Sequence, residues 1–287
     1  NHLKYLVLDL FSSFRIRAFR LHILIYIFSF TAMDVFGSVF TYYVVYCLSQ
    51  DASAVSGWLS IAAFASVPGT YGFMLLLNRL NMSPSAALRL SYGCIFLVLA
   101  FLFTVYLTKT QVPTLLFSAV FILLGAARSG LYYIPWNIYS FIPDIDEMVT
   151  QQRREGIFAG VMVLTRKSTV AIAIMIIGLV LQESGFVKGS GAQPESALGA
   201  IIGLMIFATA ALLAVSFFTT YKFKLTRETH KLLLKEIARR KLGGDYRDCD
   251  ARTRVIIKQL TGYEYDQVWG GDATRQTVGS AHLSPVK

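Results

Sequence analysis

Charged side chains are scarce in this chain of 287 residues. They form 15% of the sequence, against roughly 25% in a soluble domain, while hydrophobic residues form 55% and the mean hydropathy is +0.54. A soluble protein would also interleave polar and apolar residues at periods of about two or 3.6, and the long apolar runs of this chain lack that pattern. The composition therefore excludes an ordinary soluble domain.

Cysteine and histidine are also rare. The three cysteines, Cys47, Cys94 and Cys249, have neither paired nor metal-like spacing, so we expect isolated reduced thiols. Neither a cluster of His, Cys and Asp nor a Ser–His pair lies within the apolar runs. This argues against an intramembrane enzyme and predicts no cofactor or metal site in this chain.

Long apolar runs are what the chain has in abundance, and six of them exceed the roughly 20 residues that cross a bilayer. They cover residues 22–49, 57–77, 86–107, 114–142, 156–182 and 197–221. Strands of a membrane barrel would be about ten residues long and strictly alternating. The sequence therefore predicts an all-α membrane protein with six transmembrane helices.

The predicted bundle covers residues 21–221. It follows a basic cytoplasmic or interfacial stretch, residues 1–20, and precedes a cytoplasmic tail, residues 222–287. The sequence begins at Asn1, without Met or a signal peptide. We therefore expect it to start partway through a longer protein.

Lys and Arg alternate between rich and poor connections. Those at 78–89 and 143–155 carry two each and the tail carries 14 of the 27, whereas 50–56 carries none and 108–113 and 183–196 carry one each. Basic loops stay on the cytoplasmic side, so this multi-pass protein of the plasma or inner membrane should have both termini of the chain in the cytoplasm. The formal net charge of +10 is then mainly a topology signal, and no nucleic-acid partner is expected.

The tail contains an amphipathic helical pattern, LTRETHKLLLKEIARRKLGG. Thr226 suits the N-cap, Glu228 suits the first turn, and Gly243 with Gly244 should end the helix. A second short helix is predicted at about 251–260, and the final dozen residues should be disordered. A solvated or membrane-surface tail is the favoured interpretation.

Charges lie inside some predicted spans and not in others. If the six spans form two inverted three-helix repeats, the first and fourth occupy equivalent places, and each has a charge near mid-depth, Asp34 and Arg128. The third and sixth lack such charges, and we expect them to face lipid. Charges at that depth cost about 2.5–3.5 kcal/mol each on insertion scales, so they should line a cavity or have partners.

Thr31, Asp34, Ser38 and Thr41 follow steps of three and four and form one polar stripe on the first span. Two interpretations remain open. The stripe faces a solute path, or Asp34 makes an ion pair that only holds the bundle together.

The fourth span places Arg128, Tyr132, Trp136 and Tyr139 on one face, with Pro135 able to kink the helix. Aromatic faces stack on the C–H surfaces of sugars, and charged groups bind their hydroxyls. This face has both kinds of group, although ordinary aromatic packing is the alternative interpretation.

The fifth span carries Gly156, Gly160 and Lys167 on one face, and Arg166 lies about 100° round the helix. Within the predicted spans, Arg128, Arg166 and Lys167 are opposed by Asp34 alone. Unpaired charges are not expected in hydrocarbon. We therefore expect a second six-helix half that supplies acidic residues, or an anionic group on the substrate.

Four stretches together resemble the C-terminal half of the glycoside–pentoside–hexuronide:cation symporter family, the melibiose-carrier-like members of the major facilitator superfamily. They are LIYIFSFTAMDVFGSVFTYYVVYCL, PWN followed by PDIDE, RREG beginning in the loop beyond it, and the tail segments LTRETHKLLLKEIARRK and LTGYEYDQVW. The resemblance covers nearly the whole chain and about half of a full carrier. It implies one half of a major facilitator fold.

By this resemblance, Lys167, twelve residues after Glu155, corresponds to the family's cavity lysine. Asp144 and Glu147 match the second Asp and the Glu of the cytoplasmic motif, and Phe141 replaces the earlier Asp, which should weaken that network. The family's cation-binding carboxylates belong to the other half and are absent here.

The resemblance implies alternating access, in which Na⁺ or H⁺ drives the uptake of a sugar or glycoside. The expected substrate contacts are Arg128, Tyr132, Trp136 and Lys167, with Asp34 orienting one of those cations. An inner gate is expected from Asp144, Glu147, Arg153, Arg154 and Glu155, with a solvated loop as the alternative. A lipid or lysolipid carrier and a truncated, non-transporting membrane fragment remain open.

Overall fold

The computed structural model describes residues 11–272, and these divide into two compact units. We call residues 25–135 and 166–220 the span unit. Residues 11–24, 136–165 and 221–272 form the tail unit. Four helices have residues in both units.

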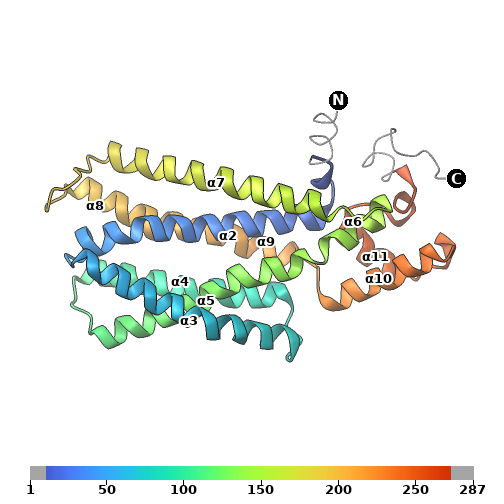
Figure 1. The fold of residues 1–287 in the computed structure, drawn as a ribbon, viewed down its shortest axis with the longest axis horizontal. Coiled ribbons are helices and arrows are strands. Elements are labelled where there is room, and N and C mark those ends of the chain that lie inside the picture. Colours follow the sequence, from blue (N-terminus) through green and yellow to red (C-terminus); the bar gives the residue numbers. More distant parts are fainter. Residues whose placement is uncertain (1–10, 273–287) are drawn as a thin grey trace. The chain divides into compact units, whose positions relative to one another are not determined.

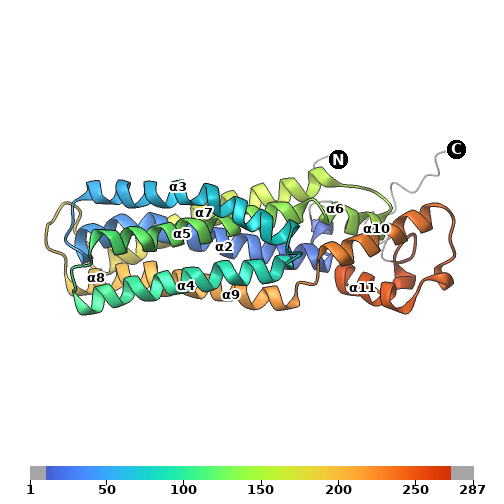
Figure 2. The same cartoon turned by 90° about the horizontal axis from the view of Figure 1, so that it is seen from below.

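Six stretches of the described chain are helices long and apolar enough to cross a membrane, and every regular element described is helical. This confirms the predicted all-α fold class, and Figures 1 and 2 show the long helices of the span unit running alongside one another. The elements are α2 (Arg17–Tyr42) with η1 (Tyr43–Cys47), α3 (Ala52–Asn78), α4 (Pro84–Thr108), α5 (Thr114–Tyr139), α7 (Glu155–Glu183), and α8 (Glu195–Ile202) with η2 (Gly203–Ala208) and α9 (Thr209–Lys222).

The helix ends follow local chemistry. Ser83 Oγ accepts a hydrogen bond from the amide of Ala86 at 3.2 Å, and Pro84 occupies the first turn of α4, which needs no amide donor there. Lys109 takes a left-handed conformation and ends the same helix. The first helix starts at Arg17, earlier than the predicted residue 22, because nothing in this stretch breaks a helix.

The connection predicted at 143–155 is mostly helical, which corrects the sequence prediction. Residues Ile142–Thr150 form α6, with Pro143 in its first turn and Asp144 near its positive end. Gln151 ends it with a left-handed conformation, so only residues 151–154 connect α6 to α7. The many acidic and basic residues of this stretch are typical of a solvated loop, which is why the sequence alone predicts a connection here.

Close helix approach holds α3 against α5 in the span unit. A Cβ built on Gly125 would lie 2.0 Å from the carbonyl oxygen of Ala62, and one on Gly69 would lie 2.6 Å from the Cα of Ala126. No side chain larger than hydrogen fits either place without moving a backbone. These two glycines therefore set the spacing of α3 and α5.

Burial differs among the six long helices. In the most apolar stretch of each, 61% of residues are buried in α2, but only 17% in α3 and 11% in α7. The third and sixth helices, which were expected to face lipid, are each 39% buried. The second helix of each predicted repeat thus presents the most apolar surface for lipid or another protein segment to cover.

The tail unit contains α6 packed with α10 (Arg227–Lys241) and α11 (Ala251–Thr261), as Figures 1 and 2 show, together with the short turns η3 (Tyr246–Asp248) and η4 (Tyr265–Gln267). Thr226 is the N-cap of α10, as predicted, and Thr226 and Thr229 cap the helix reciprocally. Gly243 lies just beyond the end of α10 with φ +84°. Both predicted tail helices are therefore present. The predicted disorder of the last dozen residues lies outside the described residues.

Candidate functional sites

An ion pair joins α2 and α7 within the span unit. Arg166 Nη1 lies 2.5 Å from Asp34 Oδ2, and Arg166 Nη2 donates a hydrogen bond to Asp34 Oδ1 at 2.9 Å. The two side chains are 20% and 25% exposed, so the pair is partly desolvated. This geometry is the bidentate one that best compensates the cost of taking both charges out of water.

The pairing corrects one sequence prediction. Asp34 was expected to orient Arg128 or Lys167, but its partner is Arg166. The 100° rotation between Arg166 and Lys167 on α7 explains the difference, because only Arg166 is turned toward α2. The predicted polar stripe is on the accessible side of α2, since Thr31 and Asp34 are half-buried and Ser38 and Thr41 are exposed.

Arg128 on α5 has a different environment. Its Nη2 donates to the hydroxyl of Tyr132 at 3.0 Å, and its guanidinium lies 5.1 Å from the centre of that ring. Both contacts come from one residue a helical turn away. No carboxylate pairs with Arg128 among the described residues.

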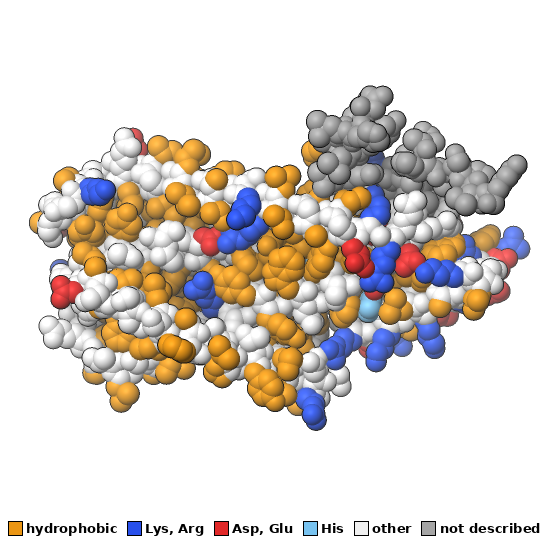
Figure 3. Space-filling model, viewed as in Figure 1, with side chains coloured by type: hydrophobic (Ala, Val, Ile, Leu, Met, Phe, Trp, Pro, Cys, Tyr) orange, Lys and Arg blue, Asp and Glu red, His pale blue; other side chains and the backbone are white. Residues whose placement is uncertain are grey.

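Phe30 links the two arginines. Its ring meets the Tyr132 ring edge-on at 4.5 Å, and the Arg166 guanidinium lies 5.1 Å from its centre. Asp34, Arg166, Tyr132 and Arg128 therefore belong to one connected cluster. On the face shown in Figure 3, a few basic and acidic side chains lie among the hydrophobic side chains of the long helices.

A cavity of about 490 Å³ opens beside Arg128 between α3 and α5. This volume is in the range of about 300–1,000 Å³ that small-molecule sites occupy. Arg128 and five hydroxyl-bearing residues supply polar groups, and alanine and leucine line the rest. The lining residues are Leu59, Ala62, Ala63, Ser66, Thr70, Arg128, Ser129, Tyr132 and Tyr133.

Lys167 and Trp136 lie apart from this cavity's lining. Lys167 is exposed on α7 and makes no ion pair with any residue in 11–272. Trp136 falls in the tail unit, where it is 43% exposed and meets Tyr139 edge-on at 5.8 Å. Of the predicted substrate contacts, the cavity beside Arg128 thus contains Arg128 and Tyr132 only.

A second charged cluster lies in the tail unit, around α6. Asp144 is buried, with Oδ2 at 2.7 Å from His230 Nε2 and Oδ1 at 3.3 Å from Arg153. The His230 ring also stacks on Phe141 at 4.1 Å and 21°. Phe141, which replaces an acidic residue of the resembled motif, therefore packs against a tail histidine instead of joining an ionic network.

The neighbouring carboxylates on α6 are also paired. Asp146 is fully buried and accepts two hydrogen bonds from Arg154, at 2.9 and 2.7 Å. Glu147 lies 2.5 Å from Lys241 at the end of α10. Arg153 also reaches Glu155 at 2.5 Å, so all five predicted gate residues lie in ion pairs.

Sequence reasoning missed three partners in this cluster: Asp146, His230 and Lys241. Asp146 was overlooked because it resembles one more charge in a polar loop. Once α6 is recognised as a helix, Asp146 lies among its buried residues. His230 and Lys241 were assigned to a separate tail. The signal available for them was the amphipathic face of α10, which required a surface to cover it.

Six membrane-length helices with charges inside them and a partly polar cavity are typical of a multi-pass membrane protein. The chain belongs to the MFS/sugar transport protein family, whose model matches residues 6–227. It is 28% identical over 248 residues to a protein of Synechocystis named "Uncharacterized symporter sll1374". That match covers 79% of this chain and 42% of the relative, so the chain spans less than half of the relative's length.

Proposed function

We propose that this chain is the C-terminal half of a cation-coupled sugar symporter of the melibiose-carrier-like type. The observation that carries the proposal is the cavity beside Arg128. It combines a guanidinium that has no carboxylate partner among residues 11–272 with two tyrosines, two serines and a threonine. Arg, Ser, Thr and Tyr bind hydroxyl groups, and tyrosine rings pack on the C–H faces of a sugar. The volume of about 490 Å³ suits a small solute.

Coupling to Na⁺ or H⁺ is part of the same proposal. The only carboxylate in the charged cluster of the span unit, among the described residues, is Asp34, and Arg166 already neutralises it. The cation is therefore expected to bind mainly to a second six-helix half. The matched region is 42% of the relative's length, which leaves room for such a half. Lys167, exposed on α7, is suited to meet carboxylates of that half or the substrate.

The α6 cluster supports an inner gate on the cytoplasmic side. Arg153 is 52% exposed and Glu155 is 58% exposed, so their pair can break at little cost, whereas the Asp146–Arg154 pair is buried and should persist. We expect the exposed pair to exchange partners as the protein changes state. The tail supplies His230 and Lys241 to this gate.

Purified complete transporter in proteoliposomes tests the proposal. Radiolabelled glucose, galactose, maltose and melibiose are offered with an inward Na⁺ gradient, an inward H⁺ gradient or neither. Uptake of at least one sugar that depends on one gradient and stops with the matching ionophore is the expected result. Gradient-independent uptake, or none for any sugar, would contradict it.

A lipid or lysolipid carrier is the second candidate, and one observation favours it. An apolar groove of about 410 Å³ runs between α2, α7 and α9, with Thr31 and Thr169 as its main polar contributors. An alkyl chain fits such a groove. Replacing Ile172 with Trp fills it, so transport of a fluorescent lysophosphatidylcholine should fall in that variant while sugar uptake stays unchanged; lysolipid transport without any sugar uptake would favour this candidate.

A further inference from the structure

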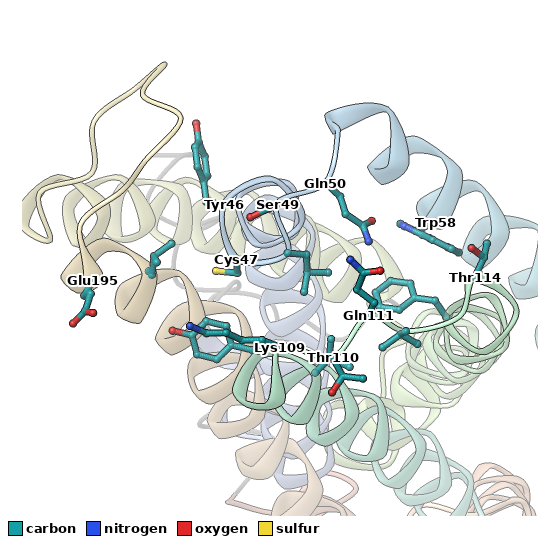
Figure 4. A pocket seen from close by; sticks show the side chains of 16 residues that line it. Tyr46, Cys47, Ser49, Gln50, Trp58, Lys109, Thr110, Gln111, Thr114 and Glu195 are labelled. Carbon is teal, nitrogen blue, oxygen red and sulfur yellow. The ribbon is translucent and has the colours of Figure 1, made fainter.

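Another cavity lies at one end of the span unit and is separate from the cavity beside Arg128. Its volume is about 1000 Å³. The connections after η1 and after α4 form its rim, with parts of α3, α5 and α8 (Figure 4). The two cavities share no lining residue.

Neutral hydrogen-bonding groups dominate one side of this cavity. Gln50 and Gln111 come from different connections, and neither amide side chain has a hydrogen-bond partner in the described structure. Figure 4 shows the ends of both amides and the nitrogen-bearing edge of Trp58 turned toward the same part of the cavity. Each amide offers donors and an acceptor, so the pair can bind adjacent hydroxyl groups.

Trp58 adds a directed donor. Its Nε1 is buried and has no acceptor among residues 11–272. Ring contacts with Phe117 at 4.7 Å and Phe121 at 5.9 Å hold the indole in place. Because buried donors are nearly always paired in native proteins, this N–H indicates a ligand or water acceptor in the cavity.

The charges that line the cavity cancel. Lys109 and Glu195 are both exposed, are of opposite sign, and lack ion-pair partners in the described part of the chain. A net charge of zero favours a neutral, hydroxyl-rich ligand over a cationic or anionic one.

We infer that this cavity, with Gln50, Gln111 and Trp58 as its binding groups, is a second sugar site that holds the solute before it reaches the cavity beside Arg128. The inference rests on the proposed function. Trp58 and Ser66, which line the two cavities, are eight residues apart on α3, a separation of about 12 Å along the helix. In the proposed orientation of the chain, this second sugar site opens on the non-cytoplasmic side of the membrane.

Cys47 is a native reporter for this site, because it lines the cavity and is a free thiol. In the complete transporter, with Cys94, Cys249 and any other cysteine replaced by alanine, the labelling rate of Cys47 by a small maleimide is measured with and without each transported sugar. We expect neutral sugars to slow labelling at least threefold. Glucosamine and glucuronate should protect less at equal concentration.

Variants separate this site from the cavity beside Arg128. The double variant Q50A/Q111A should abolish protection and raise the KM for uptake about tenfold, while W58F, which keeps an aromatic ring but removes the N–H and part of the indole, should weaken protection. Protection should persist in R128Q. The matched control is Q259A, an exposed glutamine on α11 that lies outside both cavities, and it should behave as the parent.

Two outcomes would overturn the inference while leaving the proposed function intact. One is gradient-driven uptake without any protection of Cys47. The other is protection that survives Q50A/Q111A but disappears in R128Q, because the labelling then reports the other cavity through a conformational change. Failure of gradient-driven uptake for every sugar would instead remove the proposed function, and this inference with it.

Discussion

The span unit and the tail unit place charges in contrasting surroundings. Among the described residues of the span unit, Arg128 has only a tyrosine as a polar partner and Lys167 makes no ion pair. In the tail unit, each carboxylate of α6 is paired with at least one basic side chain. The Asp34–Arg166 pair is the exception within the span unit.

The difference separates two roles of charged side chains: fixing a structure and binding a solute. A buried pair such as Asp146–Arg154 is costly to disturb and therefore fixes a structure. A cation with unused donors beside a cavity remains available to a solute. The following changes test this contrast, from the largest expected effect to the smallest.

Replacing Arg154 with Met should destabilise the tail unit by about 3–5 kcal/mol, because Asp146 would be left charged and fully buried. Thermal unfolding of the purified protein in detergent measures the loss. The matched control is R252M, because the Arg252–Glu228 pair is exposed on both sides and its loss should cost less than about 1 kcal/mol. Equal losses in both variants would break the contrast.

Replacing Gly125 with Ala should cost about 1–3 kcal/mol and disturb sugar uptake, since its Cβ would meet the backbone of Ala62 and push α3 from α5. The change is followed by thermal unfolding and uptake. Gly93→Ala is the control, because nothing lies within 4 Å of its added Cβ. A stable, fully active G125A protein would contradict the close packing described for α3 and α5.

The pair on α2 and α7 is tested by a double-mutant cycle. D34N and R166Q should show a coupling energy of about 1–3 kcal/mol in thermal unfolding, since the side chains are only partly exposed. The exchange D34R/R166D should recover part of the stability lost by either single reversal. Additive effects would show that these two side chains do not interact.

The tail also has a pH dependence with a definite sign. Burial raises the pKa of Glu236, but hydrogen bonds from Arg239 and Tyr265 outweigh it and hold this pKa below its ordinary value. A lowered folded-state pKa stabilises the fold above the ordinary value, and the contribution is lost as pH falls through the folded value. E236Q should cost about 1 kcal/mol at pH 7 and flatten the acid dependence below about pH 4.

Hydrogen exchange of the α10 amides measures this effect. The parent protein should lose protection as the pH falls below about 4, after correction for intrinsic exchange. The variant should show weaker protection at pH 7 and a smaller change on acidification. An unchanged profile would mean that Glu236 does not stabilise the packing of α10.

How much the sequence reveals depends on whether a feature is local. Run length predicts the long helices, and the Thr226 cap and Gly243 stop mark the ends of α10 because capping involves neighbours in the chain. A helical pattern shows on which face of the first span Asp34 lies, but it does not show which residue forms an ion pair with Asp34. The partner Arg166 is 132 residues away and could be identified only from the packed helices.

The same limit explains the tail. His230 lies 86 residues from Asp144, and the sequence offers no spacing rule that joins them. Helix α6 was missed for a different reason: its three acidic residues suggest a solvated loop until their partners are known. The functional roles of Arg128, Tyr132, Trp136, Lys167 and Asp34 remain predictions.

The most direct test compares gradient-driven sugar uptake by R128Q and R79Q in proteoliposomes at equal amounts of folded protein. Arg79 follows the last residue of α3 and lines none of the described cavities, so R79Q should match the parent. Uptake by R128Q should fall at least about 100-fold, because several charge-assisted contacts to the solute would be lost. Parental uptake by R128Q would contradict the claim that this unpaired cation serves the solute.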